Sequence, residues 1–213
     1  TDGAHREELV RRAASEFGRL DVLVNNAGRG FYAGVAAARV SDVEELFALN
    51  VVAPLHLAQL ALPMLRDSRG TIVMMSSVAG VVAAPRMGAY AASKFALEAL
   101  SMSLRAELAA EAADGRPPVR VLVVRPGPVD TPFRDNAVTD RAQSEGGAAK
   151  EPGVRPRGAN VQSPAVIAER TVRAVERGEA VVETSLFVRV ASMAARVAPA
   201  LFRRISASMA RER

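Results

Sequence analysis

The chain has 213 residues, of which 49% are apolar and 24% are charged. This length and composition are typical of one globular domain and exclude a disordered chain, a collagen and a coiled coil. The chain contains no cysteine, which excludes disulfides, thiolate catalysis and cysteine-ligated metals, and its two histidines are too few for a histidine-rich site, so we expect no metal.

The net charge of +5 is concentrated at the C-terminal end, where residues 185–213 carry six arginines and one glutamate. Leu, Phe, Val and Met are interspersed with them, which predicts a basic amphipathic tail. Such a tail can lie on an anionic membrane surface, cover a substrate pocket or dock on a second subunit. With no Trp, two Tyr and seven Phe, the chain has few side chains that could stack on bases, so no nucleic-acid partner is expected.

No apolar signal peptide opens the chain, and we interpret the apolar stretches as strand-length segments or as stretches broken by charges. We therefore expect no membrane-spanning helix. The expectation is a cytoplasmic protein, with association to a membrane surface through the tail as the alternative.

Apolar periodicity and capping residues predict an alternation of helices and strands. A helix begins at Thr1 or Asp2 and ends at Gly18, and Ser41-Asp-Val-Glu44 is typical of a capping box that opens a helix to about Leu65. The other elements are a strand at 20–26, a strand at 70–77, a helix at 89–113, a strand at 119–124, a polar segment at 134–162, a helix at 164–177 and a strand at 181–182.

This alternation predicts an α/β fold with a parallel sheet that helices cover on both faces. In such sheets, ligands bind beyond the carboxyl ends of the strands. We therefore expect the site in the segments that follow the strands, at 25–28, 76–80 and 126–131.

The strongest chemical signal is Tyr90-Ala-Ala-Ser-Lys94, because a tyrosine and a lysine four residues apart lie on one face of a helix. A nearby ammonium lowers the pKa of a phenol, which is otherwise near 10, and this would suit proton transfer in a hydride-transfer enzyme. Ser77 stands 13 residues before Tyr90, at the end of a predicted strand, where its hydroxyl could bind the substrate oxygen.

Asn50 lies in a predicted helix four residues before Pro54. Proline has no N–H, so the carbonyl of Asn50 loses its usual helical donor and is free to bind a water. A kinked helix without any function is the alternative interpretation.

Taken together, Asn25-Asn-Ala-Gly28, Asn50, Ser77, Tyr90, Lys94 and Pro126-Gly-Pro-Val-Asp-Thr131 resemble the short-chain dehydrogenase/reductase family in order and spacing, over about residues 1–182. The resemblance implies a Rossmann-like, doubly wound parallel sheet. It also implies NAD(P)-dependent oxidation of alcohols or reduction of carbonyls on a small-molecule substrate, by a homo-oligomer. A non-catalytic or fragmentary relative remains the alternative.

The resemblance also implies a role for each matching residue. Tyr90 would be the general acid/base, Lys94 would bind the nicotinamide ribose and lower the pKa of Tyr90, and Asn50 would hold a water of the proton relay. Ser77, rather than its neighbour Ser76, stands at the family's distance from the tyrosine and would polarise the substrate oxygen. Residues that would line the cofactor are Asn25, Ala27 and Gly28 near the adenosine ribose, and Pro126, Gly127, Val129 and Thr131 around the nicotinamide.

The family's glycine-rich turn, which follows its first strand and binds the pyrophosphate, is not found in this sequence. We therefore expect the sheet to be truncated at its N-terminal side by roughly 60 residues, about two strand–helix units and a further strand. An apolar strand edge and parts of two helix faces would then be exposed. In this interpretation residues 1–184 form a partial catalytic domain with a mobile substrate loop at 134–162, and residues 185–213 form the tail.

Overall fold

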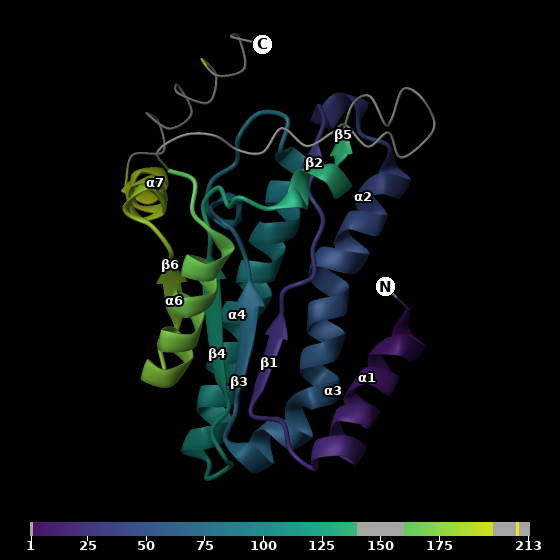
Figure 1. Cartoon of the computed structure of the whole chain (residues 1–213), viewed down its shortest axis with the longest axis vertical. Coiled ribbons are helices and arrows are strands. Elements are labelled where there is room, and N and C mark those ends of the chain that lie inside the picture. The colour runs from purple at the N-terminus through teal and green to yellow at the C-terminus, as the bar shows by residue number, and fades with distance from the viewer. Residues whose placement is uncertain (1, 140–159, 198–207, 209–213) are drawn as a thin grey trace.

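The computed structural model describes residues 2–139, 160–197 and 208. Its main sheet has four parallel strands in the order β1-β3-β4-β6: β1 (Val22–Asn25), β3 (Thr71–Met75), β4 (Arg120–Arg125) and β6 (Val181–Glu183). The helices are α1 (Gly3–Phe17), α2 (Val40–Phe47), α3 (Ala53–Ser68), α4 (Gly88–Ala113), α6 (Pro164–Arg177) and α7 (Leu186–Val197) (Figure 1). The predicted α/β fold with a parallel sheet is confirmed.

Helices cover the two faces of the sheet, because neighbouring residues along a strand point to opposite sides. Ile72 and Val121 belong to a core shared with α3 and α4, whereas Val73 and Leu122 pack with Ile167 of α6 on the other face. The four strand residues are all almost completely buried. This explains why residues 72–75 of β3 and 121–124 of β4 are all apolar instead of alternating with polar residues.

The strand β1 forms one edge of the sheet and is covered on one face only (Figure 1). Leu23 packs against the core on the α3 side, whereas Val22 and Val24 on the opposite side are 38% and 51% exposed. Leu9 and Phe17 of α1 are also exposed. No strand among the described residues pairs with the outer edge of β1. An apolar strand edge next to an apolar helix face is therefore open to solvent, as expected from the sequence.

The ends of α1 and α6 are set by residues that cap them. Asp2 caps α1 by accepting a hydrogen bond from the backbone N–H of Ala4, and Gly18 ends that helix with a φ of 66°. Ser163 caps α6, Pro164 is its first residue, and Gly178 ends it with a φ of 67°. The left-handed conformation at both glycines is one that a residue with a side chain adopts only with strain.

The predicted capping box at Ser41 is wrong. The helix begins at Val40, after Arg39, and no side chain caps it. The carbonyl of Arg39 already accepts hydrogen bonds from Asp42 and Val43, and the carboxylate of Asp42 pairs with the Arg39 guanidinium. Ser41 therefore lies inside the first turn of the helix.

From α2 the chain continues through a π-helical turn, Ala48–Val52, into α3. The whole stretch Val40–Ser68 is long and apolar enough to cross a membrane by length and composition alone, which corrects the expectation that no such helix exists. Residues 46–65 contain no Asp, Glu, Lys or Arg. Ala58, Ala61 and Leu65 are buried in the core with β3, and a buried core helix of this kind satisfies the same criteria.

The sequence did not reveal a second, smaller sheet. In it, β2 (Phe31–Tyr32) pairs in parallel with β5 (Val138–Thr139) beyond the carboxyl ends of the main strands (Figure 1). β5 therefore falls inside the polar segment that was expected to be a mobile loop. Residues 140–159 of that segment, and residues 198–207 and 209–213 of the predicted tail, lie outside the described residues.

Candidate active site

The three segments expected to form the site meet at one edge of the sheet. Asn25 pairs in register with Met74, and Met75 pairs with Val124, so β1, β3 and β4 end at nearly the same level. The residues that follow these strands, at 25–28, 76–80 and 126–131, therefore lie side by side at the carboxyl edge. A small apolar cluster that includes Phe31, Leu46 and Val138 packs around Tyr90 here.

Tyr90 lies in the first turn of α4 and is 6% exposed. Its phenol shares a hydrogen bond with the side chain of Ser77. Phe133 packs edge-on against the Tyr90 ring, with 5.8 Å between the ring centroids. The phenol is thus held between the end of β3 and the segment after β4.

Ser76 and Ser77, at the end of β3, point in different directions. Ser77 is half-buried, and its Oγ also accepts a hydrogen bond from the N–H of Ala79, at 3.1 Å. The Oγ of Ser76 is buried, has no hydrogen-bond partner, and would lie only 2.5 Å from a Cβ placed on Gly80. Alternation along the end of β3 therefore brings only Ser77 to Tyr90.

Lys94 lies one turn beyond Tyr90 and is 5% exposed. Its Nζ donates to the carbonyl oxygen of Met75 at 2.8 Å and lies 5.9 Å from the centroid of the Tyr90 ring. Burial lowers the pKa of Lys94 from its usual 10.5 to about 8, and the carboxylate of Glu98 opposes this shift. The ammonium is thus buried close to the phenol but bonded to the backbone.

The pKa of Tyr90 is shifted upward overall, and the lowering expected from Lys94 stays a prediction. Burial raises the pKa of the Tyr90 phenol above its usual 10.0, the hydrogen bond with Ser77 lowers it by less, and Tyr32 raises it further. Desolvation of the phenolate is the largest of these effects. At neutral pH Tyr90 is therefore a protonated phenol.

Asn50 lies in the π-helical turn and is completely buried. Its side chain accepts a hydrogen bond from the N–H of Arg29 at 2.9 Å and donates to the carbonyl of Arg29 at 3.0 Å. It also donates to the Oγ of Ser93, which in turn donates to the carbonyl of Tyr90. The Asn50 side chain therefore fixes the turn after β1 to the first turn of α4, a contact that the sequence argument about its carbonyl did not predict.

Gly28 packs against both of these groups. A Cβ at this position would lie 3.3 Å from Oδ1 of Asn50 and 3.6 Å from Nζ of Lys94. Any side chain here would therefore crowd the amide and the ammonium, which accounts for the glycine at the end of the Asn-Asn-Ala-Gly segment.

The other residues expected to line a cofactor lie around this centre. Asn25 is 5% exposed; its amide nitrogen faces the carbonyl of Pro54 at 3.4 Å, while its Oδ1 is buried without a partner. Ala27 is exposed, whereas Pro126, Gly127, Val129 and Thr131 are half-buried. Gly127 lies directly under Val188 of α7, so the tail helix borders the site.

Two contributors were missed by reasoning from the sequence. Ser93 stands inside the Tyr90–Lys94 segment, but its bonds to Asn50 and Tyr90 depend on the packing of α4 against the π-helical turn. The buried ion pair of Glu98 with Arg125 joins α4 to the end of β4, and no local pattern indicates it.

Comparisons with known proteins agree with this geometry. The family model for short chain dehydrogenases matches residues 1–142. "Dehydrogenase/reductase SDR family member 7B" of Xenopus laevis is 33% identical over 97% of this chain and 62% of its own length. The crystal structure of a short-chain dehydrogenase from Streptomyces avermitilis is 26% identical, superimposes with a TM-score of 0.73, and is matched over 97% of this chain and 77% of that one.

A metagenomic short-chain oxidoreductase in complex with NADP is 31% identical, with a TM-score of 0.53 over 59% of this chain and 55% of that one. The chain belongs to the short-chain dehydrogenase family, and its sheet has the Rossmann-like fold of that family. It spans 62% of the length of the Xenopus relative.

Proposed function

We propose that the protein is an NAD(P)-dependent oxidoreductase that interconverts a small-molecule alcohol and its carbonyl compound, as an alcohol dehydrogenase or carbonyl reductase. The observation that carries this proposal is the convergence of Ser77, Tyr90 and Lys94 in a buried site at the carboxyl edge of the sheet. Family members commonly act as oligomers, and we propose a homo-oligomer here.

The residues present fit the nicotinamide and the ribose parts of such a cofactor. Gly28 leaves room beside Lys94 and Asn50, and the buried, unpartnered Oδ1 of Asn25 could accept a hydrogen bond from a ligand. Gly127, Val129 and Thr131 would border the nicotinamide, which supplies or accepts the hydride when bound. The sequence has no glycine-rich turn to bind the pyrophosphate, so the fit does not extend to that group.

In this proposal the protein's own residues handle the proton. The Tyr90 phenol, protonated at neutral pH, donates to the oxygen of a carbonyl that is being reduced, and Ser77 donates a second hydrogen bond to the same oxygen. The Lys94 ammonium stabilises the negative charge that develops on the phenol as its proton leaves. The raised pKa of Tyr90 keeps the phenol protonated at neutral pH, which is the form that can act as a general acid.

The test is a Tyr90→Phe substitution in the full-length protein. We expect carbonyl reduction with NADH or NADPH to fall by about 10²–10⁴-fold, the usual contribution of a positioned general acid. Tyr32→Phe is the matched control, because it also removes one phenol near the site, and it should retain most of the activity. Unchanged turnover in Tyr90→Phe would remove the catalytic assignment and favour a non-catalytic relative.

We also propose that the protein contacts membrane surfaces through residues 185–213, in addition to a cytoplasmic location. Leu186, Val190, Met193 and Val197 form an exposed apolar stripe along α7, while Val188 on its other side is buried against the body. A basic segment with such a stripe suits an anionic bilayer.

The membrane proposal is tested by co-sedimentation with phosphatidylserine vesicles. The full-length protein should bind them better than a Val190→Asp/Met193→Asp variant, and better than it binds phosphatidylcholine vesicles. Equal sedimentation of the protein and its variant with either lipid would reject membrane contact through α7.

A further inference from the structure

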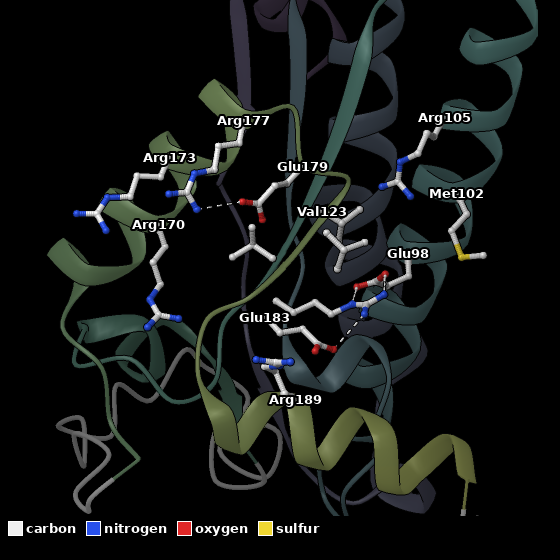
Figure 2. Close-up of a pocket in the computed structure, with 13 residues that line it drawn as sticks. Glu98, Met102, Arg105, Val123, Arg170, Arg173, Arg177, Glu179, Glu183 and Arg189 are labelled. Atoms are coloured by element: carbon white, nitrogen blue, oxygen red, sulfur yellow. Dashed lines mark hydrogen bonds and ion pairs between the residues drawn. The ribbon is translucent and has the colours of Figure 1, made fainter.

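A second concave site lies away from the candidate active site, at the outer edge of β6. It is a groove with a volume of about 720 Å³, between α4 on one face of the sheet and α6 on the other, with α7 at one end (Figure 2). None of Ser77, Tyr90 and Lys94 lines it. We call it the arginine groove, after the residues described next.

Arginines from four elements line this groove. They are Arg105 of α4, Arg125 of β4, Arg170, Arg173 and Arg177 of α6, and Arg189 of α7. The lining also contains three carboxylates, Glu98, Glu179 and Glu183. The lining therefore has six positive and three negative charges, an excess of three positive charges.

The three carboxylates are already paired. Glu98 and Glu183 both bind the guanidinium of Arg125, at 2.7 Å and 3.3 Å, and Glu179 lies 3.9 Å from Arg177. Arg173 pairs with Glu169, which lies outside the groove. Arg125, Arg173 and Arg177 are therefore each paired with at least one carboxylate.

Arg105 is held in place without a carboxylate. Its guanidinium donates to the carbonyl oxygens of Val121, at 3.0 Å, and Ala180, at 2.7 Å. Partial burial lowers its pKa, Glu98 opposes the shift, and the nearby charge of Arg125 adds to it. A fixed cation in this position would be stabilised by an anion in the groove.

Arg170 of α6 and Arg189 of α7 both line the part of the groove that is nearer to α7 (Figure 2). For these two side chains, the structure gives no carboxylate partner among the residues it describes. Together with Arg105 they place three guanidinium groups, from three different helices, around one concavity.

We propose that the arginine groove binds a small molecule carrying two or more phosphoryl groups. Guanidinium groups bind phosphate oxygens in pairs of parallel hydrogen bonds, and several arginines from separate elements suit more than one phosphoryl group. The volume lies within the usual range for small-molecule sites, about 300–1,000 Å³. The proposal does not depend on the proposed oxidoreductase activity.

The test is calorimetric titration of the full-length protein with sodium tripolyphosphate, at about 150 mM salt so that weak surface attraction is screened. We expect micromolar binding that weakens about 100-fold in an Arg170→Gln/Arg189→Gln variant, at roughly tenfold for each lost charged contact. An Arg170→Lys/Arg189→Lys variant keeps the charge but not the planar fork, and should bind with intermediate affinity. Arg12→Gln is the matched control: Arg12 is an exposed arginine on α1, paired with Glu16, and its loss should change nothing.

Three outcomes would overturn the proposal. One is the absence of tripolyphosphate binding. Another is binding that the double glutamine variant retains in full, which would place the anion elsewhere, for example at the cofactor site. The third is a dimer in analytical ultracentrifugation that the double variant dissociates while tripolyphosphate has no effect, which would make the groove a subunit interface. Unchanged circular dichroism of each variant shows that the fold is retained.

Discussion

Glu98 and Arg125 form a buried ion pair whose two side chains are 8% and 6% exposed. Both carboxylate oxygens are bound, at 2.9 Å by Nε and at 2.7 Å by an Nη of Arg125. The pair joins α4, one turn beyond Lys94, to the last residue of β4, directly before Pro126. It therefore holds together two of the elements that form the site.

Replacing Glu98 with Gln should destabilise the protein strongly, because Arg125 keeps its charge and loses its bidentate partner. We expect a loss of about 3–5 kcal/mol in the free energy of unfolding, measured by urea denaturation. Glu107→Gln, at an exposed position of the same helix, is the control and should change stability by less than about 0.5 kcal/mol. A Glu98→Met/Arg125→Met variant should recover much of the loss, and equal losses in both variants would contradict this account.

The buried ammonium of Lys94 predicts a pH dependence of stability. Its pKa is about 8 in the folded protein and near 10.5 when unfolded, so the unfolded chain binds more protons between these values. Below about pH 8 the lysine is charged in both states and burial costs the full desolvation. Above pH 10.5 it is neutral in both states and that cost disappears.

A Lys94→Met variant lacks this cost at every pH. Its free energy of unfolding relative to the unsubstituted protein should therefore fall by on the order of 2 kcal/mol as the pH is raised from 7 to 10. Tyr90 is present in both proteins, so its own titration cancels in the difference. A difference that stays constant over this range would show that Lys94 is not buried as a cation.

At the scale of single residues, the sequence predicted which side chains come together. It did not predict how their surroundings shift their pKa values. The spacings among Ser77, Tyr90 and Lys94 predicted their convergence, because helix and strand geometry determines such distances. The direction of the Tyr90 pKa shift could not be predicted, because it depends on burial by Phe133 and by residues distant in the sequence.

Helix ends were predictable wherever a cap satisfies backbone groups locally. The ends of α1 near Asp2 and at Gly18, and the bounds 164–177 of α6, were all predicted from the sequence, and each cap acts within three or four residues. The prediction for Ser41 was wrong because the pattern Ser-x-x-Glu also occurs when the serine lies inside the first turn of a helix. The pairing of β2 with β5 was not predictable, since each strand has two residues and the pair is more than 100 positions apart in the sequence.

Ser163 caps α6, whereas Ser41 lies inside the first turn of α2 and caps nothing. Alanine substitutions at the two positions test this difference. Ser163→Ala should lower the free energy of unfolding by about 1 kcal/mol, because the N–H of Val166 loses its side-chain acceptor. Ser41→Ala removes no cap, and alanine is the better helix former, so stability should be unchanged or slightly higher. Thermal unfolding of both variants provides the measurement, and a loss in Ser41→Ala equal to that in Ser163→Ala would restore the capping box.

The parallel arrangement of the sheet could be predicted from a few general rules. Which strand faces are covered by helices could not be predicted in this way. Alternating elements and apolar strands were sufficient to predict a parallel sheet with the site at its carboxyl edge. The exposure of Val22 and Val24 depends on what lies over β1 in three dimensions. Here α6 covers β4 and β6, and the face of β1 on that side is open.

This open face leads to a prediction for the 213-residue polypeptide taken alone. The residues around Lys94 and Gly28 would contact the ribose and nicotinamide parts of NAD(P), but the sequence has no glycine-rich turn for the pyrophosphate. The uncovered edge of β1 also favours self-association over a stable binding surface. We therefore expect NADH and NADPH to bind this polypeptide more weakly than about 1 mM, far from the micromolar values typical of working enzymes. Nicotinamide fluorescence is the measurement, and a micromolar dissociation constant would mean that the residues at the carboxyl edge bind the dinucleotide without that turn.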